Sequence, residues 1–275
     1  MRTCFSLSSL ACASLIALAC TAQAQAATFP VYPDTTVNSE GLDYTLDSRT
    51  AGVLTFSSYA AGAMDVFNAK LTSTGGATLR TTVEEQGYYT SIDVKMPVTS
   101  VTANTINLGG TTYIGGADAK YQGGLSIQIP VGKPIASRGG SISLSNLHVD
   151  AVRQQVFADV VGGNDVGSIS QLAVWNFSPI SYGNQEVVPT CTTYGGCHAI
   201  VSVNNKIGNL TLTQEGFEVF SRSLNLTDLG KSALASVDSF GTITTSVPEP
   251  SSWALAVAGM LGIGVMKRRR ATTTH

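Results

Sequence analysis

Charge is scarce in this 275-residue chain, because only 12% of its residues are Asp, Glu, Lys or Arg. Five of the 16 basic residues lie near the two ends, namely Arg2, Lys267, Arg268, Arg269 and Arg270. The rest of the chain holds 11 basic against 18 acidic residues, a net charge of about −7. We therefore expect no nucleic-acid partner, since no basic stripe meets phosphates. The low charge and the abundant Ser, Thr and Gly are typical of folded secreted β-proteins.

Cysteine and histidine are also few, at five and three residues. Three cysteines lie in the first 20 residues, so only Cys191 and Cys197 belong to the remainder of the chain. An even number of cysteines around a short Gly-containing loop predicts one disulfide in an exported protein. The alternative is a metal site that uses His198, but no second Cys-x-x-Cys pair accompanies it. We expect neither a metal nor a cofactor.

Apolar runs of about 20 residues, the length that spans a membrane comfortably, are missing. The first shorter run, Leu7 to Ala19, follows Arg2 and precedes two Ala-x-Ala frames that end at Ala24 and Ala26. This order predicts a signal peptide over residues 1–26, cleaved after Ala26. A lipoprotein signal at Cys20 is the alternative, which the bulky Leu18 fits poorly.

The second apolar run ends before the basic cluster at residues 267–270. From Trp253 to Met266 it counts 14 residues, which span about 21 Å as a helix against a hydrocarbon core of about 30 Å. Tryptophan suits the membrane interface, and cations stay on the cytoplasmic side. We predict a short transmembrane helix whose mismatch is covered by snorkelling and local thinning. The preceding Pro248, Glu249 and Pro250 favour an extended peptide that an enzyme can reach.

This order of parts, from Val247 to Arg270, resembles the PEP-CTERM sorting signal of Gram-negative bacteria. The resemblance implies that an exosortase, a membrane cysteine transpeptidase, recognises Pro248, Glu249 and Pro250 and removes the tail. It also implies a link to extracellular polysaccharide or biofilm. We expect signal peptidase and exosortase as processing partners, an intermediate tethered to the inner membrane, and a final place on the cell surface or in the extracellular matrix.

Residues 27–246, called the body below, read as one mainly β domain, an antiparallel sandwich or meander. Segments 124–130 and 141–145 alternate with period two. The phase slips after Asn146, which predicts a β-bulge there, and residues 156–160 form the partner strand across a turn at 150–153. Gly-Gly pairs mark further turns, at residues 75–76, 109–110, 115–116, 123–124, 139–140 and 162–163. A split into two domains near Gly116 is the alternative.

The last third of the body predicts one or two short helices. Residues 210–212 suggest a strand, Thr213 to Glu215 suggest a helix start, and Phe217, Phe220 and Leu224 follow at helical spacing. A second helix is expected over 227–235, and a closing strand over 240–245.

Catalytic patterns are weak in the body. It lacks a Gly-x-Ser-x-Gly elbow, and His148 alternates in a strand where we expect it to point to solvent. Carboxylate pairs would suit glycoside hydrolysis, and the candidates are Glu84, Glu85, Asp93, Asp159 and Asp165. The first three lie close together near a turn, which favours surface charge over catalysis. Residues 162–167 suit a hairpin turn better than a single calcium-binding turn.

Aromatic side chains offer an alternative role in stacking on sugar rings, although aromatic residues on strands more often fill the core. The candidates are Tyr88, Tyr89, Tyr113, Tyr121, Trp175 and Tyr182. Segments 139–149, 156–160 and 210–213 also look faintly like the HtaA-type β domains of bacterial haem-uptake proteins. That resemblance supports a β fold more than haem binding.

From the sequence we therefore expect a non-enzymatic structural or carbohydrate-interacting β domain, sorted by an exosortase. A secreted polysaccharide-acting enzyme and a haem or small-ligand binder are the alternatives.

Overall fold

The computed structural model describes residues 28–39, 42–108, 111–132, 134–178, 181–182, 190–191, 197–200 and 205–246. The predicted signal peptide, with its cleavage residues Ala24 and Ala26, lies outside the described residues. So does the sorting segment over 247–270, with Pro248, Glu249, Pro250, Trp253 and the basic cluster. No helix within the described ranges has the length and apolar character needed to cross a membrane.

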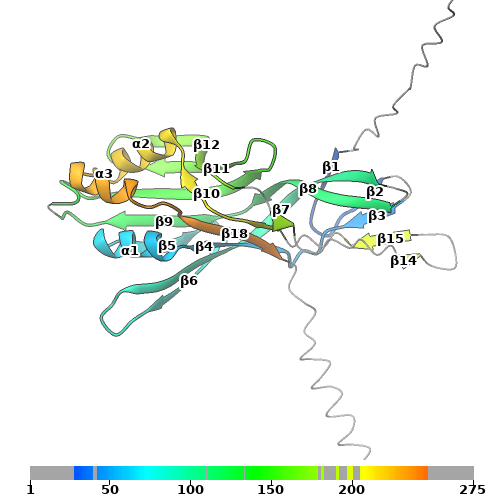
Figure 1. The fold of residues 1–275 in the computed structure, drawn as a ribbon, viewed down its shortest axis with the longest axis horizontal. Helices are drawn as coiled ribbons and strands as arrows, with labels where there is room; N and C mark the ends of the chain where they lie inside the picture. Colours follow the sequence, from blue (N-terminus) through cyan, green and yellow to red (C-terminus); the bar gives the residue numbers. More distant parts are fainter. Residues whose placement is uncertain are drawn as a thin grey trace, which may run out of the picture.

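A 14-stranded sheet forms most of the body, and its strands pair antiparallel (Figure 1). Its strands are β1 (Thr28–Val31), β4 (Ala51–Phe56), β5 (Lys70–Thr74), β6 (Thr78–Val83), β7 (Tyr89–Leu108), β8 (Thr111–Tyr121), β9 (Gly124–Ile129), β10 (Gly140–Asp150), β11 (Gln155–Gly162), β12 (Gly167–Asn176), β13 (Ser181–Tyr182), β16 (Asn205–Ile207), β17 (Thr211–Leu212) and β18 (Gly241–Ser246). The main path through the sheet runs β13-β16-β18-β4-β7-β8-β10-β11-β12-β17.

A second, four-stranded sheet lies at the end of the molecule toward which β7 and β8 extend (Figure 1). Its strands are β2 (Thr36–Ser39), β3 (Leu42–Thr45), β14 (Thr190–Cys191) and β15 (Cys197–Ile200). The β15–β3 pair is parallel, and the other pairs of this sheet are antiparallel.

The 20-residue strand β7 holds the large sheet together. Its first half pairs with β4 and β6, and its second half pairs with β1 and β8. One continuous strand thereby joins the part of the body that carries the helices to the part near the small sheet.

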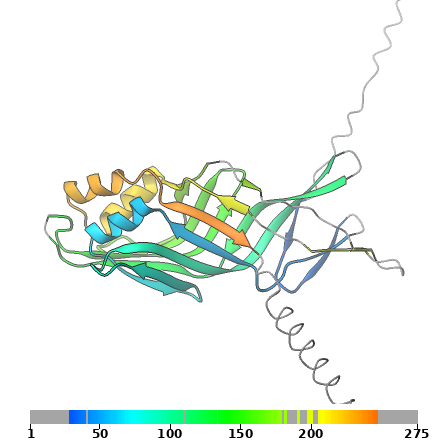
Figure 2. The same cartoon turned by 60° about the horizontal axis from the view of Figure 1, so that its bottom comes forward.

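Three short helices cover one face of the curled sheet: α1 (Ser58–Val66), α2 (Gln214–Ser223) and α3 (Asp228–Ala235) (Figure 2). The strands under them alternate buried and less buried residues, as in β10, where Ile142 and Leu144 are buried. Phe220 and Leu224 are each 1% exposed. The core thus lies between the helices and the inner face of the sheet.

Several predicted features are confirmed. The register of β10 against β11 shifts between Ser145 and His148, and Asn146 has a φ of 50°, so the bulge lies where the phase slip placed it. Leu147 and Val149 are buried after the slip. Helices α2 and α3, strand β18 and the hairpin turn at 163–166 also form as expected.

The expectation of antiparallel β structure is confirmed, but the expected helix content was too low. Helix α1 lies early in the body, where no helix is expected from the sequence. Ser57 caps it by accepting a hydrogen bond from the Ala60 N–H at 3.1 Å, and Ala60, Ala61 and Met64 are buried. The alanines at 60, 61 and 63 and Met64, which favour a helix, behind a serine cap are the signal that was missed.

Some of the predicted Gly-Gly turns form, and others do not. Gly75 and Gly76 form a turn, whereas Gly115 and Gly116 lie inside β8, so the turn predicted there is wrong. At 123–124 the chain is interrupted without reversing, because β8 and β9 both pair with β10. Position 109–110 lies outside the described residues.

Candidate functional site

Among the described residues, the five candidate carboxylates for glycoside hydrolysis share no hydrogen-bond partner. Glu84 and Glu85 are exposed beside the β6–β7 turn, and Asp165 is exposed at the tip of the β11–β12 hairpin. Asp93 accepts hydrogen bonds from Thr55 at 2.7 Å and Ser91 at 2.9 Å. Within the described part of the chain, no hydrogen bond joins any two of these carboxylates.

Asp159 has a different role, because it holds two distorted strands. Its Oδ2 accepts from Asn146 Nδ2 at 3.0 Å, and its Oδ1 accepts from Ser170 Oγ at 3.1 Å and from the Gln171 N–H at 2.9 Å. Asn146 and Gln171 both have φ near 50°, which L-residues rarely adopt. The hydrogen bond from Asn146, with those from Gln171 and Ser170, lowers the pKa of Asp159 against the opposing effect of partial burial. The carboxylate therefore stabilises adjacent bulges in β10 and β12.

His148 lies on the outer face of β10, as its alternation predicts, but it is not open to solvent. Its side chain is 20% exposed, and its ring centroid is 5.9 Å from that of Phe157. Its Nε2 is 3.8 Å from Asp118 Oδ2, too far for a hydrogen bond. Phe157 and Asp118 cover the histidine, which is why simple alternation overestimated its exposure.

The four aromatic candidates whose side chains the structure describes do not form one platform. Tyr121 and Trp175 are buried at 3% and 1% exposure, so they belong to the core. Tyr89 is partly buried and donates a hydrogen bond to the Ala69 carbonyl, whereas Tyr88 is 57% exposed. The side chains of Tyr113 and Tyr182 lie outside the described part.

The predicted disulfide falls on strands β14 and β15. Their antiparallel register makes Cys191 and Cys197 direct Cα partners. Opposed residues of antiparallel strands lie about 4.5–5.5 Å apart at Cα, within the range that a disulfide bridges. The bond itself stays a prediction. In the described ranges, no group of three or more His, Cys, Asp or Glu residues can hold a metal ion.

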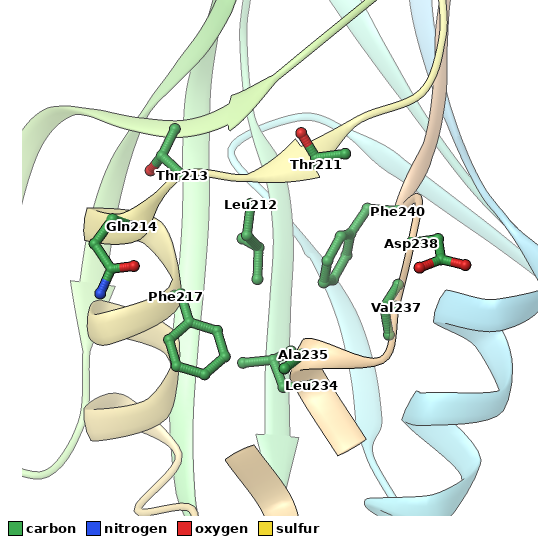
Figure 3. A pocket seen from close by; sticks show the side chains of 10 residues that line it. All are labelled: Thr211, Leu212, Thr213, Gln214, Phe217, Leu234, Ala235, Val237, Asp238 and Phe240. Atoms are coloured by element: carbon green, nitrogen blue, oxygen red, sulfur yellow. The ribbon is translucent and has the colours of Figure 1, made fainter. Parts of the chain in front are cut away.

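A hollow of about 350 Å³ opens between β17, the start of α2, the end of α3 and the loop before β18 (Figure 3). We call it the β17 hollow, and its lining consists of Thr211, Leu212, Thr213, Gln214, Phe217, Leu234, Ala235, Val237, Asp238 and Phe240. Its volume falls in the lower part of the range of about 300–1,000 Å³ for small-ligand sites.

The β17 hollow owes its shape to the way α2 begins. Thr213 Oγ1 accepts from the Gly216 N–H at 2.9 Å and donates to the Ala173 carbonyl at 2.5 Å. A side chain at residue 216 would place its Cβ 2.5 Å from the Val174 carbonyl oxygen, so glycine lets the helix start directly on β12. The cap and the glycine together hold Phe217 beside Leu212.

The lining combines an apolar floor with polar edges. Leu234 and Phe240 are buried, and Leu212 and Phe217 are partly buried. The exposed side chains of Gln214 and Asp238 lie on opposite sides of the hollow (Figure 3). Such a site can place an aromatic ring against the C–H face of a ligand and hydrogen bond its hydroxyl groups. The sequence placed Phe217 on the helix but gave no sign that it lines a hollow, since its neighbours come from α3 and the following loop.

Comparison with known proteins adds one finding. Residues 246–270 match the family model described as the PEP-CTERM protein-sorting motif. The chain is thus an exported protein that carries the signal for exosortase processing and membrane-linked sorting to the cell surface. Neither a curated protein nor a solved structure matches the chain.

Proposed function

We propose that this chain is a non-enzymatic surface protein of a Gram-negative bacterium, whose β domain binds carbohydrate in the extracellular matrix. The sorting motif at residues 246–270 carries the proposal. In this scheme Pro248, Glu249 and Pro250 are recognised by the exosortase, and a short helix bounded by Trp253 and the basic cluster holds the intermediate in the inner membrane. Processing then transfers the body to the surface or matrix.

Mass spectrometry of the mature C-terminus in fractionated native cells tests the sorting. We expect a terminus near Pro250. A mature protein that still ends at His275 would contradict removal of the tail. Replacing Pro248, Glu249 and Pro250 by alanine should retain the precursor in the membrane fraction, whereas replacing Ser251 and Ser252 by alanine is the matched control and should leave processing unchanged.

The β17 hollow supports the carbohydrate role of the body. Its partly buried Phe217 and Leu212 offer an apolar surface, and Gln214 and Asp238 offer hydrogen-bonding groups at the edges. Flat apolar surfaces with polar edges suit sugars, whose rings have C–H faces and hydroxyl rims.

The disulfide predicted between Cys191 and Cys197 would stabilise the small sheet.

Binding of polysaccharide extracted from the host's own matrix tests this role. We expect Phe217→Ala to weaken binding about tenfold, because loss of one aromatic contact costs roughly 1–2 kcal/mol. Tyr32→Ala, which truncates an exposed aromatic residue that does not line the hollow, is the control. Equal binding by both variants would remove the hollow from the proposal, and release of new reducing ends during incubation would contradict the non-enzymatic role.

A further inference from the structure

The end of β18 restricts where the body lies while the sorting segment is held in the membrane. Ser246, the last residue of β18, is the Cα partner of Ala51 at the start of β4. Seven residues, 247–253, follow it up to and including Trp253, the first residue of the apolar run. At most about 3.6 Å per residue, they reach about 25 Å. The end of β18 is therefore no further than about 25 Å from the start of the apolar run, an argument that rests on the membrane-held stage proposed above.

Two lysines share the outer face of the sheet near this end. Five residues form a row of Cα partners across neighbouring strands: Lys206 of β16, Thr244 of β18, Val53 of β4, Lys95 of β7 and Thr78 of β6. The next residues along these strands, including Ile243, Leu54 and Val94, are buried in the core. Because side chains alternate between faces, Lys206 and Lys95 both point outward, and both are exposed.

A small hollow of about 180 Å³ lies beside Lys95. We call it the β4 hollow, and its lining consists of Ser48, Arg49, Thr50, Ala51, Gly76, Thr78, Lys95 and Pro97. Thr50 is 1% exposed, and its buried Oγ1 has no hydrogen-bond partner among the described residues. A buried hydroxyl without a partner costs stability unless a bound group completes it.

The charge around the β4 hollow is positive although the chain as a whole is acidic. Arg49 donates hydrogen bonds to Asp47, from Nε to Oδ1 at 3.0 Å and from a terminal guanidinium nitrogen to Oδ2 at 2.5 Å. This pairing lowers the pKa of Asp47 to about 2, so the carboxylate stays ionised and offsets one cation. Lys95 and Lys206 make no ion pair within the described part of the chain, and they leave the surface with an excess of positive charge.

We propose that this surface docks on anionic phospholipid, with a lipid phosphate in the β4 hollow beside Lys95 and a second headgroup at Lys206. The two lysines are three strand spacings apart, about 14 Å, which suits separate headgroups. The hollow is smaller than sites for drug-sized ligands but combines hydroxyl groups with cations, the donors that bind phosphate oxygens. Docking orients the body on the membrane before the tail is processed.

Lysine footprinting of the full chain tests the proposal. The chain is reconstituted in nanodiscs of phosphatidylcholine alone or mixed with phosphatidylglycerol, acetylated with an activated ester, and read by mass spectrometry. We expect acetylation of Lys95 and Lys206 to fall about fivefold with phosphatidylglycerol. Lys231 of α3, whose side chain is 48% exposed, is the internal control and should react equally in both lipids.

Hydrogen exchange gives a second readout with matched variants. Backbone exchange over residues 47–53 should slow in phosphatidylglycerol nanodiscs, and Lys95→Gln with Lys206→Gln should abolish this slowing. Lys70→Gln with Lys120→Gln removes the same charge from exposed positions elsewhere on the sheet and should preserve it.

The possible failures are distinguishable. A chain that nanodiscs do not retain contradicts the membrane-held stage of the proposed function. A retained chain with equal Lys95 and Lys206 reactivity in both lipids contradicts lipid docking alone. If inorganic phosphate without phosphatidylglycerol protects Lys95 and Lys206 from acetylation equally well, the surface is a general anion site, and docking on the membrane is overturned.

Discussion

Single residues decide how the strands of this sheet bend. Asn146 in β10 and Gln171 in β12 both have positive φ, and β11 between them supplies Asp159 to both. A bulge leaves backbone groups outside the regular ladder, and here one carboxylate accepts from the side chain of one bulge and the backbone of the other. The bulges in β10 and β12 are thereby linked through the single carboxylate of Asp159.

Asp159→Asn should lower the free energy of unfolding by about 1–3 kcal/mol, because the new amide presents donors where Asn146 and Gln171 already donate. Urea denaturation of the two proteins measures the difference. Asp165→Asn, at the exposed tip of the next hairpin, is the matched control and should change stability by less than about 0.5 kcal/mol. Similar losses in both variants would contradict the role given to Asp159.

The same carboxylate predicts a loss of stability in acid. Its folded pKa is lowered, so its contribution is complete above the unfolded value of about 4 and is lost as pH falls through the folded pKa. The difference in stability between the native protein and Asp159→Asn should therefore shrink below about pH 4. A difference that stays constant down to pH 2 would contradict the charged hydrogen bonds.

Helix α2 is the element that links the core to the β17 hollow. Its buried side, with Phe220, packs on the sheet, while Phe217 lines the hollow. The start of the helix is attached to β12 through the hydrogen bond from Thr213 to Ala173. The position of the β17 hollow therefore depends on the N-terminal cap of α2 at Thr213 rather than on residues in the interior of that helix.

Thr213→Ala should cost about 1–2 kcal/mol of unfolding free energy, since it removes the acceptor for the Gly216 N–H and the bond to β12. Thr213→Ser retains the hydroxyl and should stay near the native value. Thermal unfolding followed by circular dichroism distinguishes the variants. If serine is as destabilising as alanine, the methyl group rather than the cap carries the effect.

At the scale of the whole molecule, Tyr121 joins strands that are distant in sequence. Its ring covers Gly52 of β4, where an added Cβ would lie 2.2 Å from the ring, and its hydroxyl is 2.6 Å from Thr245 Oγ1 in β18. Tyr121 itself belongs to β8. The contact thus fastens the last strand of the body, which leads to the sorting motif, to the inside of the curled sheet.

Burial raises the pKa of Tyr121 to about 12, against an ordinary value near 10. The folded state keeps the phenol protonated between these values while the unfolded state loses the proton, so stability should fall as pH rises from about 10 to 12, by on the order of 2 kcal/mol. Urea denaturation across this range measures the decline. In Tyr121→Phe this part of the decline should be absent; an unchanged decline would assign it to other groups.

The sequence alone predicted the sorting motif, the antiparallel β character, the bulge at Asn146 and the helices near the end of the body. These features are local, since they depend on spacing within a few residues, on capping side chains and on the order of short segments. The signals for helix α1 are equally local, but the sequence analysis expected helices only near the end of the body.

Only the tertiary structure decided the features that join distant residues. It covered His148 with Asp118, buried Tyr121 against Gly52, and brought Phe217 together with Leu234 and Phe240 in the β17 hollow. It also placed Lys95 and Lys206 on one face near the end of β18. Strand order and sheet curvature set these distances, and neither is encoded in a short run of sequence.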